Sequence, residues 1–524
     1  MAFLPGSMTA APPLEPLRYA LLMMKTEYLH MNDFACETSM GGASSAVCSP
    51  AMAPVSGAYL DYAAATPMDS AVLDAMLPYL TSRFHNPSAP YAAARAVRAD
   101  YETARATLAR LIGARPACVT ITAGATEANN LAFASVGAWR GRTGAGSPQA
   151  HPAGAVEEPE PPHVVTLATE HESVLACARA CGDATLVDVG RDGRVDPTSI
   201  AEALTPRTEL VSVSLANGEL GCVQPVSDIA RVVAAERTRR LETGDPRPIW
   251  LHVDASQAAA YLSVNVASLG ADLLTLSAAK VYGPKQVGLL WAREDVCLRP
   301  LVRGGGQEGG LRSGTENVAG AIGFAQALEL ACERRSSEAR RVAGLRDVLQ
   351  RRLTQTFPWM LVWGPRKPKG RLPSHLSLSF PGLEARRLVI LLEDAGVCVG
   401  TGSACAASRM ERSHVLEAIG LTAEEADGSL RISLGHPTTE AEIDYAAGAI
   451  EDAVRRECAR LGVDPATGER AGAAGRALGV CACEASGQGA TGEGARTAAL
   501  GVASRVTGVA DVENQGDAGK GALR

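Results

Sequence analysis

Aromatic residues, an excess of basic charge and long apolar runs are all scarce in this sequence of 524 residues. Phe, Trp and Tyr make up only 4% of the chain, which suits close packing of helices on a sheet better than a β-sandwich. The 50 basic residues against 57 acidic ones argue against a nucleic-acid binder, which needs a basic surface. No apolar run approaches the ~18 residues that span a bilayer, so no membrane segment is expected.

Cysteine spacing that would indicate a disulfide framework or a metal site is also missing. The 13 cysteines are scattered, odd in number and often placed inside apolar stretches. This distribution predicts reduced thiols in a cytosol-like compartment. Cys481 and Cys483 alone are too few for a metal site, so no resident metal is expected.

Four segments differ in composition from the rest of the chain. Residues 1–55 lack a sustained hydrophobic period and contain several acidic residues, so we expect a disordered extension, or a start codon placed too far upstream, rather than a transit peptide. Residues 141–162 and 236–248 are polar and indicate surface insertions. Residues 466–524 hold few large apolar side chains and are expected to be disordered.

Short apolar runs alternate with helical patterns between these segments. Helices at 172–180 and 227–235 separate several of the runs, which indicates βαβ units and a mainly parallel sheet. We therefore predict an α/β fold with a large domain over 56–320. The runs that predict its strands are 117–121, 164–169, 185–189, 210–215, 249–254, 271–279 and 287–292.

The pattern changes after residue 320. A long helical stretch at 319–352 is followed by a strand at 375–380, a helix at 384–395 and a strand near 430–434. This order predicts a smaller α+β domain over 321–465.

Lys280 ends an apolar strand and is followed at once by Tyr-Gly-Pro. Strand ends in α/β sheets are where ligands bind, and a partly desolvated lysine there can form a Schiff base with an aldehyde cofactor. Taken alone, however, the lysine is better explained as a side chain that snorkels at the sheet edge.

Two further features place ligand chemistry on the same sheet edge. Asp254 closes a strand and would suit the ring nitrogen of a pyridoxal cofactor, although an isolated aspartate there is more simply a helix N-cap. The turn Gly124-Ala125-Thr126 precedes a helix and offers backbone N–H groups and a hydroxyl to a phosphate. In this order the three features specify a phosphate site, a ring-nitrogen partner and a Schiff-base lysine.

The sequence resembles the cysteine desulfurase family, a class V branch of the fold-type-I pyridoxal-phosphate enzymes, from about residue 59 to residue 460. The resemblance implies a large domain with a mainly parallel sheet, a smaller domain, pyridoxal 5′-phosphate as cofactor and L-cysteine as substrate. The motifs that carry it are the segments 59–67, 86–88, 123–127, 169–171, 217–221, 253–254, 280–285, 304–308 and 312–315.

The resemblance implies a role for each residue around the cofactor ring. Lys280 would hold the cofactor as a Schiff base and later move the α-proton of the substrate. His171 would stack on the ring and assist proton transfer, although a histidine at a helix start often has no such function. Asp254 would pair with the ring nitrogen and Gln257 with the phenolic oxygen.

Further roles concern the phosphate and the amino-acid substrate. The resemblance implies that Ala125, Thr126 and Ser277 bind the phosphate and that Thr315 reaches it from a partner subunit. Asn217 and Arg431 would bind the substrate, Arg431 through a bidentate contact with its carboxylate.

Cys405 decides which reaction the resemblance implies. It lies among small residues near 400–410, where a mobile and accessible nucleophile is expected. In the family this cysteine takes the sulfur as a persulfide while alanine is released, and a transient iron–sulfur contact would also fall here. For any other single cysteine, such as Cys398, a buried structural thiol is the better interpretation.

Four positions depart from the family pattern, and one of them is His85, which replaces a frequent glycine before Asn86-Pro87. Ala279 stands where relatives usually carry a histidine, which removes a phosphate or ring contact. Gln286 replaces a common glycine and changes a turn, and Gly218 stands where a second asparagine is common.

The sequence therefore predicts a cytoplasmic, homodimeric cysteine desulfurase that passes sulfur to an iron–sulfur scaffold or a thiolation acceptor, with neither nucleic acid nor membrane as partner. Import into an organelle through residues 1–55 is left open. The nearest alternative is a selenocysteine lyase, which shares the cofactor machinery. The alternative from another class is a non-catalytic scaffold subunit, for which Ala279 is the only support.

Overall fold

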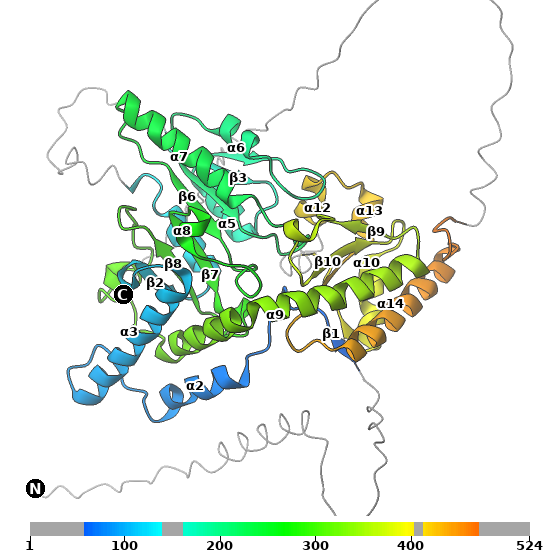
Figure 1. Cartoon of the computed structure of the whole chain (residues 1–524), viewed down its shortest axis with the longest axis horizontal. Coiled ribbons are helices and arrows are strands. Elements are labelled where there is room, and N and C mark those ends of the chain that lie inside the picture. The colour runs from blue at the N-terminus through cyan, green and yellow to red at the C-terminus, as the bar shows by residue number, and fades with distance from the viewer. Residues whose placement is uncertain (1–56, 139–160, 403–411, 471–524) are drawn as a thin grey trace, which may run out of the picture. The chain divides into compact units, whose positions relative to one another are not determined.

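The large sheet of the computed structural model, which describes residues 57–138, 161–402 and 412–470, has seven strands in the order β2-β8-β7-β6-β5-β3-β4 (Figure 1). Only β8 runs antiparallel to its neighbours, so the sheet is mainly parallel and the predicted fold class is confirmed. Each strand falls within two residues of its predicted position. Their bounds are β2 (Val119–Thr122), β3 (His163–Leu167), β4 (Asp183–Val187), β5 (Thr208–Ser214), β6 (Trp250–Asp254), β7 (Leu273–Ser277) and β8 (Gly288–Ala292).

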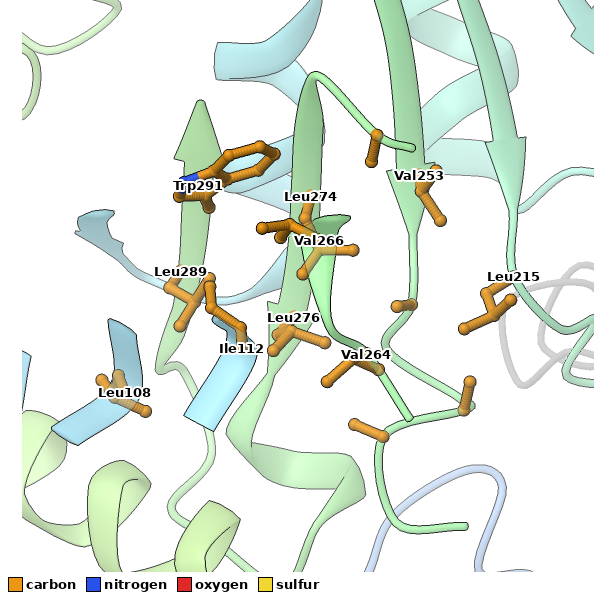
Figure 2. Close-up of a cluster of buried hydrophobic side chains, with 14 of the residues drawn as sticks. Leu108, Ile112, Leu215, Val253, Val264, Val266, Leu274, Leu276, Leu289 and Trp291 are labelled. Atoms are coloured by element: carbon orange, nitrogen blue, oxygen red, sulfur yellow. The ribbon is translucent and has the colours of Figure 1, made fainter. Parts of the chain in front are cut away.

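Helices cover both faces of this sheet, and successive strand residues point to opposite faces. Leu273 packs in one buried cluster with helices α4 (Ala125–Phe133) and α5 (Glu172–Ala180), whereas Leu274 packs in another with α3 (Ala92–Ile112) and α7 (Val226–Thr243). Figure 2 shows the second cluster, in which Leu108 and Ile112 of α3 lie near the strand residues Leu276 and Leu289.

A second, smaller sheet is antiparallel and has the order β12-β10-β9. Its core also contains Ala58 and Leu60, because β1 (Ala58–Tyr59) pairs in parallel with β11 (Val397–Cys398). The sequence pattern did not predict this pairing, and the domain boundaries at 56–320 and 321–465 stay a prediction. The strands and helices here are β9 (Leu361–Trp363), β10 (His375–Ser379), β12 (Ser429–Ser433), α10 (Ala385–Asp394), α12 (His414–Ala418), α13 (Ala423–Asp427) and α14 (Glu440–Leu461).

The long helix α9 (Val318–Thr356) contributes to both cores. Its first turns, with Phe324 and Leu328, pack in the core of the large sheet, and its later turns, with Leu345 and Leu349, pack in that of the small sheet. The remaining elements are α2 (Ser70–Thr81), α6 (Pro197–Ala203), α8 (Val266–Leu269) and the 3-10 turns η1 (Pro116–Cys118), η3 (Ala278–Lys280), η4 (Glu308–Gly310) and η5 (Pro368–Gly370).

The predicted polar insertion at 236–248 is wrong in its first half, because α7 continues through it. Arg239 and Arg240 each contact Glu236 at 2.7 Å, across one helical turn. Such pairs stabilise a helix whose sequence is polar. Gly244, at φ 71°, then ends the helix in a left-handed conformation that glycine adopts without cost.

The other three unusual segments lie largely outside the described residues. Residues 1–55, residues 141–160 of the first insertion and residues 471–524 of the tail lie outside the described residues. Among the described helices, none combines the length and the apolar character needed to cross a bilayer.

Glu308 anchors the loop that leads to Thr315. Its carboxylate accepts hydrogen bonds from Arg105 at 2.5 and 2.6 Å, from the Tyr101 hydroxyl at 2.7 Å and from the Ile121 backbone N–H at 2.7 Å. The Glu308 side chain is only 3% exposed and the Arg105 side chain 10%. The loop is therefore attached to α3 and β2 by a buried, fully hydrogen-bonded ion pair.

We expect Glu308→Ala to destabilise the protein by about 3 kcal/mol, because it leaves the buried Arg105 without its main partner. The matched control is Glu329→Ala, which breaks the ion pair with Arg110 on the protein surface and should cost less than ~1 kcal/mol. Urea unfolding of both variants measures the difference. Equal losses would show that the buried pair has no special role.

Candidate active site

Loops at the carboxyl ends of β2, β3, β5, β6 and β7 line one cavity of about 420 Å³. Parallel strands end at the same sheet edge, so residues far apart in sequence meet there. Nine of the residues that the sequence predicts for the cofactor and the substrate lie in this wall: Ala125, Thr126, His171, Asn217, Asp254, Gln257, Ser277, Lys280 and Arg431.

Lys280 lies in η3, directly after β7, and is half-buried. Its Nζ donates hydrogen bonds to the backbone carbonyls of Ala63 and Ala64, at 2.6 and 2.5 Å. The same N-terminal segment is attached to the lysine turn by Thr66, whose N–H and hydroxyl both bind the carbonyl of Ala279. The lysine amine is thus held at the cavity wall by backbone oxygens.

The carboxylate of Asp254 is fixed in position by two donors. Asn129 Nδ2 donates to Oδ2 at 2.8 Å, and the backbone N–H of Ser256 donates to Oδ1 at 3.0 Å. Asn129 is fully buried in α4 and also contacts the Ser173 hydroxyl. The sequence analysis missed this role for Asn129, because nothing in the local pattern shows that α4 packs against the end of β6.

The turn before α4 presents backbone N–H donors to the cavity, and no side chain of the described residues caps them. Gly124 has φ 107°, and no side chain caps the helix that follows. Glu127 holds the turn in place, since its carboxylate accepts from the Ala123 N–H at 2.8 Å and from Arg312 at 3.0 Å. Free N–H groups at a helix start attract an anion such as a phosphate.

His171 caps the start of α5 and faces the cavity. Its Nδ1 accepts a hydrogen bond from the Ser173 backbone N–H at 3.1 Å, so the ring proton of the neutral form is on Nε2. Burial lowers the pKa of His171 below its ordinary value, although the residue keeps contact with solvent through the open cavity. The negative charge of Asp254 opposes this shift, and the positive charge of Lys280 adds to it. The ring is therefore neutral near pH 7.

Asn217 and Gln257 make contacts within the protein. The Asn217 carboxamide donates to the Thr169 carbonyl at 2.9 Å and accepts from two backbone N–H groups of its own turn, also at 2.9 Å. Gln257 Nε2 donates to the Ala63 carbonyl at 3.0 Å. A Cβ at Gly218 would lie 2.9 Å from that nitrogen, so the glycine leaves room for Gln257.

Arg431 is buried in β12 and forms an ion pair with Asp61 at 2.7 Å. Its Nη1 is 3.5 Å from the Gly218 carbonyl, and its Nε has no hydrogen-bond partner among the described residues. The guanidinium therefore keeps donors available for a carboxylate in the cavity.

Glu170 is a buried carboxyl group that the sequence analysis did not single out. The Ser214 N–H and hydroxyl donate to Oε1, at 2.8 and 3.2 Å, while Oε2 has no partner in the described part of the chain. Burial, with a smaller contribution from Asp254, raises the pKa of Glu170 to about 8. Its backbone carbonyl contacts His414 Nε2 at 2.9 Å, which brings a second imidazole to the cavity.

Two predicted site residues do not lie in this wall. Thr315 lines a neighbouring cavity of about 530 Å³ in the same chain, together with Glu308 and Arg312. Cys405 lies outside the described residues.

Glu170→Gln should change how stability depends on pH. Between pH 4.5 and 8 the folded wild type holds a proton on Glu170 that the unfolded chain has released, so this group reduces stability as pH rises, by about 1.4 kcal/mol per unit. The glutamine variant lacks this dependence. Urea unfolding of the cofactor-free proteins measures this difference. From pH 5.5 to 7.5 the free energy of unfolding of the variant should rise relative to that of the wild type.

Glu202→Gln, an exposed residue of α6, is the control and should follow the wild-type profile. Parallel profiles for Glu170→Gln and the wild type would mean that the buried carboxyl is already ionised below neutral pH.

Residues 58–446 match the aminotransferase class-V family. The cysteine desulfurase IscS of Dictyoglomus turgidum is 36% identical over 402 residues, covering 76% of this chain and 94% of that protein. Cysteine desulfurase IscS 1 of Archaeoglobus fulgidus is 35% identical, covering 76% of this chain and 97% of that protein.

Among solved structures, a NifS-like protein matches with a TM-score of 0.66 and 30% identity, over 76% of this chain and all of that one. SspA in complex with cysteine matches with a TM-score of 0.57 and 30% identity, over 72% and 98%.

Proposed function

The chain belongs to the cysteine desulfurases of the class-V aminotransferase family, and we propose that its reaction takes place in the cavity around Lys280. L-cysteine is converted to L-alanine, and its sulfur is transferred to Cys405 as a persulfide. The observation that carries the assignment is the presence of Lys280, Asp254 and His171 in the wall of one cavity.

The enzymes of this family depend on pyridoxal 5′-phosphate, and the residues of the cavity fit that group. Several buried polar atoms of the cavity lack a partner among the described residues, as expected where a polar ligand binds. The free N–H groups before α4 suit the phosphate, and the fixed carboxylate of Asp254 suits the ring nitrogen. The unpartnered atoms are Thr169 Oγ1, Glu170 Oε2, Ser256 Oγ and Arg431 Nε.

When bound, pyridoxal 5′-phosphate supplies the electron sink of the reaction. Lys280 Nζ carries the cofactor and moves the α-proton of the substrate. His171 holds and passes a proton at Nε2, because its Nδ1 is engaged by Ser173. Arg431 binds the substrate carboxylate, and Asp61 fixes the orientation of the guanidinium.

Five further residues complete the proposed site. Gln257 would contact the phenolic oxygen of the cofactor, and Asn217 would bind the substrate. Ala125, Thr126 and Ser277 would bind the phosphate.

Cys405 completes the chemistry. The carbon–sulfur bond of L-cysteine breaks, the sulfur is taken by the Cys405 thiolate, and the remaining carbon chain is protonated and leaves as alanine. The persulfide then passes to an iron–sulfur scaffold or to a thiolation acceptor, and a transient iron–sulfur contact at Cys405 belongs to this step.

We further propose a homodimer in the cytoplasm. Thr315 would reach the phosphate of a partner subunit, so that neither subunit has a complete site alone. The eight described cysteines are all free thiols, which supports a reducing compartment. The prediction that Cys398 is a buried thiol is wrong, because it is exposed at the end of β11.

Cys405→Ser tests the function. The variant should still bind cofactor and L-cysteine, because the residues proposed for those contacts lie elsewhere. It should lose desulfuration by several orders of magnitude, since a hydroxyl oxygen cannot take up the sulfur. Alanine and sulfide are assayed together, and mass spectrometry of the wild type after brief exposure to L-cysteine should find one added sulfur on the peptide that contains Cys405.

The matched control is Cys398→Ser, which should keep wild-type turnover. Sulfur found on Cys398 or Cys222, or full activity in Cys405→Ser, would show that the nucleophile is misassigned. A wild type that acts on L-selenocysteine alone would be a selenocysteine lyase.

A further inference from the structure

Gln286 has a backbone conformation that residues other than glycine rarely adopt. Its φ is 55°, in the left-handed region where glycine is favoured. A non-glycine residue persists in such a conformation when its surroundings require it, and such residues are concentrated at functional sites.

The strand register places Gln286 beside the turn proposed for the phosphate. Gly288 opens β8 and pairs with Thr122 of β2 on one side and with Ser277 of β7 on the other. A Cβ at Gly288 would lie 2.6 Å from the backbone of Gly124, so the two segments are in close contact. Gln286 precedes Gly288 by two residues and borders the cavity next to this contact.

Gln286 is exposed and borders both the cavity of Lys280 and the neighbouring cavity of Thr315. Among the described residues, Ala123 is the other one that borders both cavities, and it carries no polar side chain. The carboxamide of Gln286 makes no hydrogen bond to any described residue, so its two N–H donors are available to a ligand.

We propose that Gln286 binds the phosphate of the cofactor through its carboxamide N–H groups. This inference rests on the proposed function and adds a phosphate ligand to it. The amine of the neighbouring residue, Lys285, is instead directed to the Thr66 carbonyl, at 2.6 Å.

The test compares pyridoxal 5′-phosphate with pyridoxal, which lacks the phosphate. Gln286→Gly should weaken binding of the phosphorylated ligand to the cofactor-free protein by about 10- to 100-fold, as for a lost hydrogen bond to a charged group. Binding of pyridoxal should stay within about twofold. Gln286→Glu keeps the shape of the side chain and should weaken the phosphorylated ligand further, because the carboxylate repels the phosphate.

Gln257→Ala is the matched control and should weaken both ligands alike, since Gln257 is proposed to contact the ring. Melting of the cofactor-free variants checks folding, and Gln286→Gly should melt no lower than the wild type because glycine relieves the positive φ. Wild-type affinity in both Gln286 variants, or equal losses for the two ligands, would overturn the proposal. A wild type that binds neither ligand would overturn the proposed function and this inference with it.

Discussion

The candidate site depends on the parallel alignment of β2, β3, β5, β6 and β7, which end at one edge of the sheet. Asp254 ends β6, and Lys280 follows β7 by three residues. Buried clusters on both faces hold the strands in register, so the loops after them have fixed starting points. A slip of one strand would turn its side chains to the opposite face and separate the groups of the cavity.

Strained backbone and unsatisfied polar atoms both occur at or near the proposed site. The described non-glycine residues with positive φ are Tyr282, Gln286 and Glu308, all in the stretch that joins the lysine turn to the Thr315 loop. Four of the buried polar atoms without a described partner belong to residues of the Lys280 cavity, Glu170 and Arg431 among them. Strained backbone and unsatisfied polar groups each cost about 1–3 kcal/mol, and the two large cores offset these costs.

The sequence predicted the elements with local signals well. The helix at 172–180 has the predicted bounds, and the strands of the large sheet are confirmed because apolar runs of this length are typical of buried parallel strands. Contacts between distant segments were not predicted: the β1–β11 pair, Asn129 on Asp254, and the ion pair of Arg431 with Asp61. Such contacts depend on how elements pack, which leaves no periodic signal in the chain. The polar composition of 236–248 was misleading because ion pairs along the helix support a polar sequence.

The central claim is that Lys280 holds the cofactor in this cavity. Reduction of the purified protein with borohydride would fix the cofactor to its lysine, and peptide mapping would then identify the labelled residue. The account predicts a single label on Lys280, at one per chain, with none on Lys285, whose amine is bound to the Thr66 carbonyl. A label on Lys285, or an unlabelled protein that still releases alanine from L-cysteine, would contradict it.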